Sequence, residues 1–300
     1  MNIMITGVSG QLGSELKHIL SCGRAEIGDI PSAYDGAVLF CPTSMELDIS
    51  NEEKVREYFA NHEIELVINC AGYTNVDACE TNEETAYAVN ALGPEYLARA
   101  AEKVQAKMVH VSTDYVFPGT AARPRVESDQ VKPLSAYGRT KLAGEQVVQK
   151  NCTRFFIVRT AWLYGYNGKN FVKTMLSLGE KHDKVSVVAD QIGNPTSAND
   201  LAYVILKLAL TDSYGVYHVT NEGECAWSEF ATAIMKGAHL SCMVEPVSSA
   251  QWKQINPAAA DRPAFSSLEN KGLEDTIGNE MRPWRQALDS YLANYDNRVK

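Results

Sequence analysis

A tyrosine and a lysine four residues apart could act as an acid and its electrostatic partner. They are Tyr137 and Lys141, in the stretch SAYGRTK. An offset of four places both side chains on one helical face, one turn apart. A phenol has a pKa of about 10, and a nearby ammonium can lower it by roughly 1 to 3 units, which makes the phenol a usable proton donor. On its own, the pair also fits two solvated residues of an ordinary helix.

A hydroxyl group that could hold a carbonyl follows the candidate strand MVHV. This run leads into Ser112 and Thr113, and ligands bind at the carboxyl ends of the strands of a doubly wound sheet. Thr113 is therefore a candidate for contact with a substrate carbonyl. Alternatively, these residues only cap a turn, as Asp114 also can.

Three glycines lie three residues apart in ITGVSGQLG, between a candidate strand and an amphipathic helix. Gly7 would allow a tight turn, Gly10 the close approach of a diphosphate, and Gly13 the packing of helix on strand. The spacing is GxxGxxG rather than GxGxxG, and an ordinary strand-to-helix turn is the alternative. Together with the tyrosine, the lysine and the hydroxyl, the glycines indicate a dinucleotide site.

These groups need a sheet and helices to position them, and the first half of the chain alternates between the two. The clearest strands are NIMIT, LVINC, MVHVST and FFIVRT, with GVYHVT later. The run VLFCP is a candidate second strand of uncertain register, and residues 83–104 predict a helix bent or restarted at Pro94. The pattern predicts an α/β fold with a Rossmann-type doubly wound parallel sheet.

The alternation weakens after Trp162, where Gly- and Asn-rich loops separate shorter helices. We therefore expect a smaller, discontinuous C-terminal substrate domain formed by residues 161–194 and 221–300. Residues 1–160 would form the dinucleotide-binding domain, with residues 195–220 packing back onto it.

Composition excludes several classes of protein. The chain has 300 residues, 45% of them hydrophobic, and a formal net charge of -9, which disfavours nucleic acid as a partner. No apolar run approaches the roughly 18 residues of a membrane span, and the absence of a basic leader predicts the cytoplasm. Seven scattered cysteines without a CxxC pair predict buried thiols, and six histidines without ligand spacing predict no metal site.

The strings TGVSGQLG, NCAGYT, STDYVF and YGRTK, in this order, resemble an extended short-chain dehydrogenase/reductase. The longer strings STDYVFPG, RTAWLYG, DQIGNPTSANDLA and RPAFSSL are similar to one branch of it, the dTDP-4-dehydrorhamnose reductases. The resemblance runs from Met1 to about Leu288. It implies that an NAD(P)H-dependent enzyme reduces the C4 ketone of dTDP-4-dehydrorhamnose to dTDP-L-rhamnose.

The resemblance also implies roles for individual residues. Tyr137 would donate the proton, Lys141 would lower its pKa and hold the nicotinamide ribose, and Thr113 would bond the sugar carbonyl. The other cofactor-binding residues would be Gly7, Gly10, Gln11, Leu12, Gly13, Asp48, Ile49, Ala71, Gly72 and Tyr73. The substrate would contact Asp114, Trp162, Asn170, Gln191, Pro195 and Arg262, with Thr113. Asp48 and Ile49 could equally be turn residues, and Arg262 could equally be a surface arginine. At Tyr73 the sequence departs from the family, in which histidine or another residue often stands.

The expected cofactor is NADPH, with NADH possible. No acidic residue directly follows VLFCP to bind a ribose 2′-hydroxyl, whereas Thr43 and Ser44 could donate to a 2′-phosphate. The expected partner is a nucleotide-sugar, with neither nucleic acid nor membrane, and the chain would be a monomer or a homodimer.

Three alternatives share parts of this pattern. A nucleotide-sugar 4,6-dehydratase would follow the threonine with an Asp-Glu pair, whereas here Asp114 precedes Tyr115. A 4-epimerase would use the same tyrosine and lysine and need no net reductant. A non-catalytic relative, like the β subunit of methionine adenosyltransferase, would bind cofactor and a partner protein without reducing any sugar.

Overall fold

The computed structural model describes residues 1–120, 123–257 and 259–299. Its centre is a parallel sheet in the order β12-β7-β6-β5-β1-β4. The strands are β1 (Asn2–Thr6), β4 (Val38–Phe40), β5 (Leu66–Asn69), β6 (Lys107–Thr113), β7 (Phe155–Thr160) and β12 (Gly215–His218). The chain moves outward from β1 to β4 and then crosses to β5 on the other side of β1. This switch point is where doubly wound sheets bind ligands.

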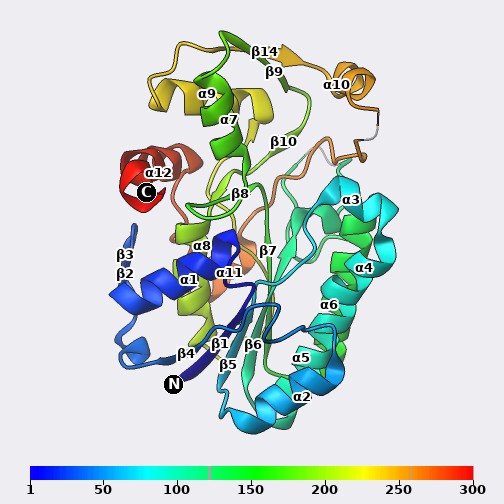
Figure 1. The fold of residues 1–300 in the computed structure, drawn as a ribbon, viewed down its shortest axis with the longest axis vertical. Coiled ribbons are helices and arrows are strands. Elements are labelled where there is room, and N and C mark those ends of the chain that lie inside the picture. The colour runs from blue at the N-terminus through cyan, green and yellow to red at the C-terminus, as the bar shows by residue number, and fades with distance from the viewer. Residues whose placement is uncertain (121–122, 258, 300) are drawn as a thin grey trace.

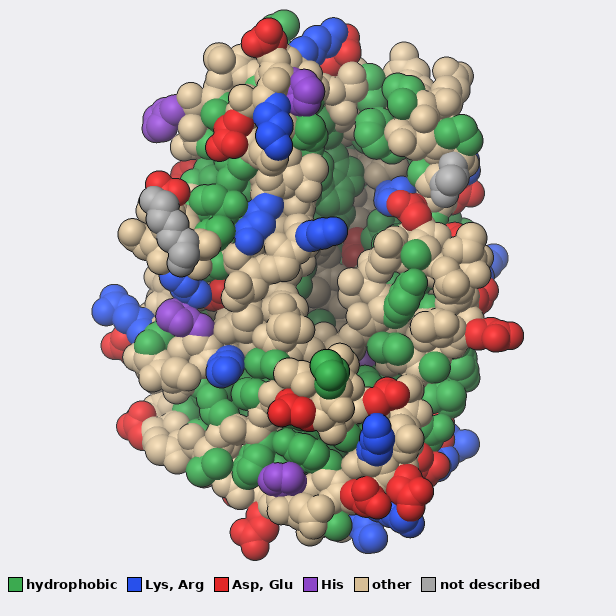
Figure 2. All heavy atoms as spheres, in the orientation of Figure 1, with side chains coloured by type: hydrophobic (Ala, Val, Ile, Leu, Met, Phe, Trp, Pro, Cys, Tyr) green, Lys and Arg blue, Asp and Glu red, His purple; other side chains and the backbone are tan. Residues whose placement is uncertain are grey.

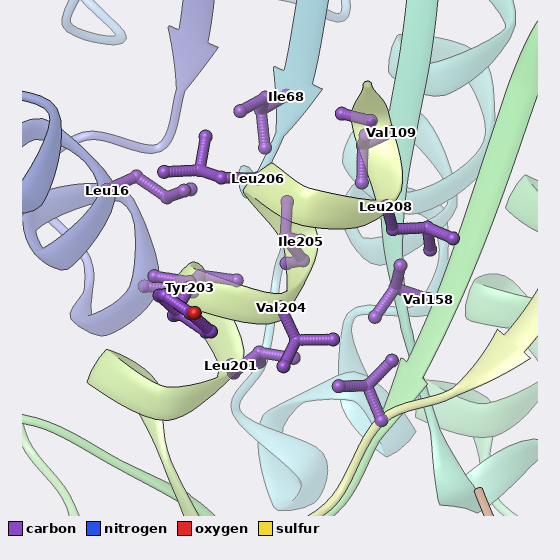
Figure 3. Close-up of a cluster of buried hydrophobic side chains, with 14 of the residues drawn as sticks. Leu16, Ile68, Val109, Val158, Leu201, Tyr203, Val204, Ile205, Leu206 and Leu208 are labelled. Carbon is purple, nitrogen blue, oxygen red and sulfur yellow. The ribbon is translucent and has the colours of Figure 1, made fainter. Parts of the chain in front are cut away.

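Alternate residues along the strands bury their side chains against two layers of helices. Ile3 and Ile5 pack with α1 (Gln11–Cys22) and α8 (Ala198–Ala209). Met4 packs with α2 (Glu52–Asn61), α5 (Gly93–Lys103) and α6 (Ala136–Asn151) on the opposite face. Figure 1 shows both layers, and Figure 3 shows apolar side chains of α8 meeting those of the sheet. The predicted doubly wound α/β fold is confirmed.

Three further helices and a pair of strands form a second layered unit above the carboxyl ends of the strands of the main sheet (Figure 1). Here α7 (Phe171–Gly179), α9 (Trp227–Gly237) and α12 (Trp284–Val299) share one apolar core with the parallel pair β9 (Lys184–Val188) and β14 (Met243–Val247). Short pairings join the loops between the units, namely β8 (Leu163–Tyr164) with β11 (Thr196–Ser197) and β10 (Ile192–Gly193) with β13 (Cys225–Ala226).

The smaller elements complete the described chain. They are β2 (Arg24–Ala25), β3 (Gly28–Asp29), α3 (Val76–Thr81), α4 (Glu83–Tyr87), α10 (Ser249–Ile255) and α11 (Lys271–Thr276), with 3₁₀ turns at Ser32–Tyr34 and Asp114–Val116. None of the helices in the described ranges combines the length and apolar character needed to cross a bilayer.

Most local predictions hold, with informative differences. The second strand ends at Phe40 because Pro42, two residues on, has no N–H for a ladder. The predicted restart at Pro94 is confirmed, since α5 begins at Gly93, and a π-helical turn over Ala88–Leu92 separates α5 from α4. The expectation of buried thiols is wrong for Cys22, which lies exposed at the end of α1. Cys41 and Cys70 are half-buried, and the other cysteines are buried.

Candidate active site

A cleft of about 780 Å³ lies at the switch point, between the carboxyl ends of the strands and the second unit. The space-filling view shows the surface hollowed between these two parts (Figure 2). Most of the residues predicted for a site line this one cleft, namely Gly7, Gly10, Gln11, Leu12, Gly13, Asp48, Ile49, Ala71, Gly72, Thr113, Asp114, Tyr137, Lys141, Trp162 and Asn170. Residues far apart in the sequence are therefore brought together.

The turn from β1 to α1 has no room for side chains at its glycines. Gly7 has φ +66°, and a Cβ there would lie 2.7 Å from the backbone of Cys70 and Ala71 at the end of β5. A Cβ at Gly13 would lie 2.4 Å from the Gly7 carbonyl oxygen, and the Gly10 N–H donates to that oxygen at 2.9 Å. The glycines thus hold α1 tightly against the sheet.

The N-terminus of α1 suits a diphosphate. The cap residue Gly10 has no side chain to accept from the first-turn N–H groups, and that turn carries no acidic residue. Helix N-termini bind anions through such free N–H groups and the helix dipole. The side-chain oxygen of Gln11 is buried there without a hydrogen-bond partner among the described residues. These features fit the pyrophosphate of a dinucleotide cofactor.

Thr113 and Tyr137 meet at the opposite wall of the cleft. Thr113 ends β6, and its hydroxyl donates to Asp114 Oδ1 at 2.9 Å. Tyr137 lies in the first turn of α6, which Ser135 caps by accepting from the Gly138 N–H at 3.1 Å. A Cβ at Gly138 would lie 2.3 Å from a backbone oxygen of the 3₁₀ turn after β6, so this glycine lets α6 approach the strand end.

Lys141 lies one turn after Tyr137 and is almost fully buried. Its ammonium donates to the carbonyl oxygen of Val111 on β6 at 2.6 Å. Burial lowers the pKa of Lys141 to about 8, opposed mainly by the nearby charge of Glu145. An ammonium therefore stands at the floor of the cleft at neutral pH.

The pKa of Tyr137 differs from the sequence-based expectation. Burial raises the pKa of the phenol, and a hydrogen bond with the Thr113 hydroxyl partly offsets this effect. Lys141 is not among the causes, because its ammonium bonds to Val111 instead. The predicted lowering by Lys141 is thus wrong for the chain alone, and Tyr137 keeps its proton throughout the neutral range.

Asp114 is a buried carboxyl group that lines the cleft. Burial raises the pKa of this group to about 6. Its Oδ1 accepts from Thr113, whereas its Oδ2 has no hydrogen-bond partner among the described residues. This oxygen could accept a hydrogen bond from a ligand hydroxyl group.

Two stacked indoles form the wall contributed by the second unit. Trp162 has φ +46° and stacks on Trp227 with ring centroids 3.5 Å apart and planes 5° apart. A Cβ at Gly193 would lie 2.5 Å from the Trp162 ring, so only glycine leaves room for it. Trp227 could not be predicted as a site residue, because a tryptophan at the start of an amphipathic helix gives no chemical signal.

The remaining predicted residues lie differently. Asp48 accepts from the N–H and hydroxyl of Ser50 at 3.0 and 2.6 Å, so it is both a turn residue and a wall of the cleft. Asn170 caps α7 by accepting from the Lys173 N–H at 3.0 Å. Ile49 packs against Gly93, where an added Cβ would lie 2.8 Å from it.

Four predicted residues do not line the cleft. Tyr73 packs beside Tyr137 and donates its backbone N–H to Asn90 at 2.8 Å. Gln191 donates to Ser249 at 2.9 Å. Arg262 pairs with Asp77 at 3.1 Å. Pro195 is buried between β10 and β11.

Other residues of the cleft had no signal in the sequence. They are Thr6, Val8, Ser9, Pro42, Leu47, Cys70, Thr74, Val76, Val89, Val111, Tyr115, Thr160, Ala161, Leu163, Gly168, Lys169 and Trp227. Across the described ranges, no three or more His, Cys, Asp or Glu side chains gather in a way that could hold a metal ion.

The relatives of this chain are similar over its whole length. The dTDP-4-dehydrorhamnose reductase of Mycobacterium tuberculosis is 40% identical over 298 residues, which cover 97% of this chain and 92% of that protein. The crystal structure of a dTDP-4-dehydrorhamnose reductase from Clostridium acetobutylicum superposes with a TM-score of 0.92 at 42% identity, covering 99% and 100% of the two chains. The enzyme of that name from Bacillus anthracis, in complex with NADP, gives 0.89 at 39% identity, covering 98% and 99%.

The sequence model of one family, described as the RmlD substrate binding domain, matches residues 1–297. This match and the full-length relatives confirm the resemblance predicted from the sequence. The chain belongs to the RmlD substrate binding domain family.

Proposed function

We propose that this chain reduces the C4 ketone of dTDP-4-dehydrorhamnose to dTDP-L-rhamnose, with NADPH or NADH as reductant. One observation carries the proposal: Thr113, Tyr137 and Lys141 line the same cleft as the glycine turn at the N-terminus of α1. A phenol, a hydroxyl and an ammonium thus stand within one cavity with a diphosphate cradle. Relatives that are 34% to 40% identical over their full length carry the name of this reductase.

The mechanism assigns one task to each polar group. The chemistry that a bound dihydronicotinamide would supply is donation of a hydride to C4 of the sugar. Tyr137 donates its proton to the carbonyl oxygen as negative charge grows there, and Thr113 holds that oxygen in line. Lys141 binds the nicotinamide ribose and, in the complex, stabilises the phenolate that remains. The protein contributes mainly the alignment of these groups.

The ammonium of Lys141 is held by the Val111 carbonyl at the floor of the cleft. The free oxygen of Asp114 and the stacked indole of Trp162 would face the sugar. Asn170 would shape the loop beside it. Contacts of Gln191, Pro195 and Arg262 with the substrate stay predictions from the resemblance, as does that of Tyr73 with the cofactor.

We divide the chain into a cofactor domain and a substrate domain. Residues 1–160 with 195–220 form the cofactor domain, since α8 and β12 pack with the sheet. Residues 161–194 and 221–300 form the substrate domain, and Trp162 and Trp227 pack against its shared apolar core. We place the reaction in the cytoplasm, with the chain as monomer or homodimer and without nucleic acid as partner.

The test is to follow absorbance of the reduced nicotinamide with freshly generated dTDP-4-dehydrorhamnose and either NADPH or NADH. A fall in absorbance with dTDP-L-rhamnose as product supports the reductase. Product formation without net oxidation of the cofactor would favour the 4-epimerase. Cofactor binding without any sugar product, together with capture of a partner protein in a pull-down, would favour the hypothesis of a non-catalytic regulatory subunit.

A further inference from the structure

A glutamate holds both donors of the threonine that follows the second strand of the sheet. Glu46 Oε2 accepts from the Thr43 N–H at 2.8 Å and from its hydroxyl at 2.9 Å. The Glu46 N–H donates back to the Thr43 hydroxyl oxygen at 3.4 Å. These reciprocal contacts form a capping box around a short turn. Taken alone, they would only stabilise that turn.

The turn that Thr43 and Glu46 form lies beside the cleft. Thr43 and Ser44 line the cleft directly after β4, which pairs with β1. In Rossmann-type folds, the residues after the second strand face the ribose 2′ position of the cofactor. Thr43 is one of the two residues whose hydroxyls the sequence offers to a 2′-phosphate. In the structure, a carboxylate already occupies its donors.

The charges around the turn have both signs. Hydrogen bonds from Thr43 lower the pKa of the Glu46 carboxyl, and hydrogen bonds from Ser50 lower that of Asp48. Both groups are therefore anionic at neutral pH. Lys17 lies within electrostatic reach of Cys41, and Lys54 of Asp48.

We propose that Glu46 acts through Thr43 as a specificity-determining residue that shifts the cofactor preference toward the 2′-hydroxyl form. A 2′-phosphate must displace or face this carboxylate to reach Thr43. A 2′-hydroxyl can instead donate a hydrogen bond to it, as the acidic residue of NAD-binding folds does. The inference rests on the proposed function, since it requires a dinucleotide in this cleft.

The experiment measures dissociation constants of NAD⁺ and NADP⁺ by calorimetry, without sugar nucleotide, for the unaltered chain, Glu46→Gln and Glu46→Ala. Glutamine keeps an oxygen that can accept from Thr43 but removes the charge, whereas alanine removes both. An exposed charge of this kind changes affinity by about three- to fivefold. We expect the ratio of NADP⁺ to NAD⁺ affinity to rise by about that factor in Glu46→Gln, and at least as much in Glu46→Ala.

Glu102 offers a matched control. Its carboxylate accepts from the N–H and hydroxyl of Thr153 at 2.7 and 2.9 Å, and hydrogen bonds from Thr153 lower its pKa in the same way. Glu102 lies near the end of α5, and Thr153 lies just before the start of β7. Both are therefore at the amino ends of the strands, whereas the cleft is at the carboxyl ends. Glu102→Gln should leave the affinity ratio unchanged.

Two outcomes would overturn the inference. One is an unchanged ratio in Glu46→Gln and Glu46→Ala, with circular dichroism showing that both are folded. The other is an equal shift in Glu102→Gln. Failure of the unaltered chain to bind either dinucleotide is a different result, because it overturns the proposed function and this inference with it.

Discussion

The ammonium of Lys141 donates a hydrogen bond to the carbonyl oxygen of Val111 at 2.6 Å. Val111 lies two residues before Thr113 on β6, so this bond fixes α6 against the strand that carries the hydroxyl. The relative positions of Thr113, Tyr137 and Lys141 are therefore set by the fold of the chain alone. Preorganisation of this kind is what electrostatic catalysis requires.

Replacement of Tyr137 by phenylalanine should remove most of the activity. The variant keeps the ring that packs beside Tyr73 and loses only the proton donor. General acid catalysis contributes roughly 10²- to 10⁴-fold, so kcat should fall by about that factor. The affinity for the reduced cofactor, measured by fluorescence titration, should stay nearly the same.

Tyr115→Phe is the control for this substitution. Tyr115 also lines the cleft, and its ring meets that of Tyr137 edge to face at 5.5 Å. Because the proposed mechanism gives its hydroxyl no proton to transfer, kcat should change by less than about tenfold. Equal losses in the two variants would show that Tyr137 is not the proton donor.

Gly7→Ala should be far more damaging than Gly23→Ala. Both glycines have positive φ, so backbone strain in each alanine variant lowers the stability by about 1 kcal/mol. At Gly23 the added Cβ meets nothing within 4 Å, whereas at Gly7 it meets the backbone of Cys70 and Ala71. Urea unfolding should show a loss of about 2 to 4 kcal/mol for Gly7→Ala, with loss of dinucleotide binding. Equal losses would mean that the close packing at Gly7 is unimportant.

The pKa of Asp114 predicts a pH-dependent stability difference. The folded pKa of about 6 lies above the usual value of about 3.9, so the folded state binds the extra proton between these values. The contribution of Asp114 to stability is present below pH ~4 and is lost as the pH rises through ~6. Asp114→Asn should therefore gain about 1 to 3 kcal/mol relative to the unaltered chain between pH 4.5 and 7.5, measured by urea unfolding. A constant difference across this range would contradict a pKa of Asp114 raised by burial.

Trp227→Leu should weaken sugar-nucleotide binding and spare the cofactor. The stacked partner of Trp162 is lost, while the apolar contact with Phe230 is kept. Aromatic stacking is worth roughly 0.5 to 1.5 kcal/mol, so KM for the sugar nucleotide should rise by about three- to tenfold. The circular dichroism of the coupled indoles should disappear as well. Trp252→Leu on α10, outside the cleft, should leave KM unchanged.

Much of this architecture could be predicted from the sequence, because its causes are local. The apolar run FFIVRT is enough to predict a strand, and the spacing of Tyr137 and Lys141 is enough to place both on one helical face. The glycine turn is likewise visible in a short stretch of sequence. The π-helical turn before Pro94 could not be predicted, since its Asn90 bonds to Tyr73 and Thr140, which are distant in the sequence. The stack of Trp162 on Trp227 joins a loop residue to the first residue of α9, 65 positions further along the chain. The raised pKa of Tyr137 depends on burial and on which partner Lys141 chooses, which are properties of the folded chain.

The most direct test of the proposed reduction is to trace the hydride. Purified chain is given dTDP-4-dehydrorhamnose and NADPH carrying deuterium at both C4 positions of the nicotinamide, and the product is analysed by mass spectrometry and NMR. The proposed mechanism predicts dTDP-L-rhamnose one mass unit heavier, with the deuterium bonded to C4 of the sugar. Sugar recovered without deuterium at C4, in the presence of bound cofactor, would contradict it.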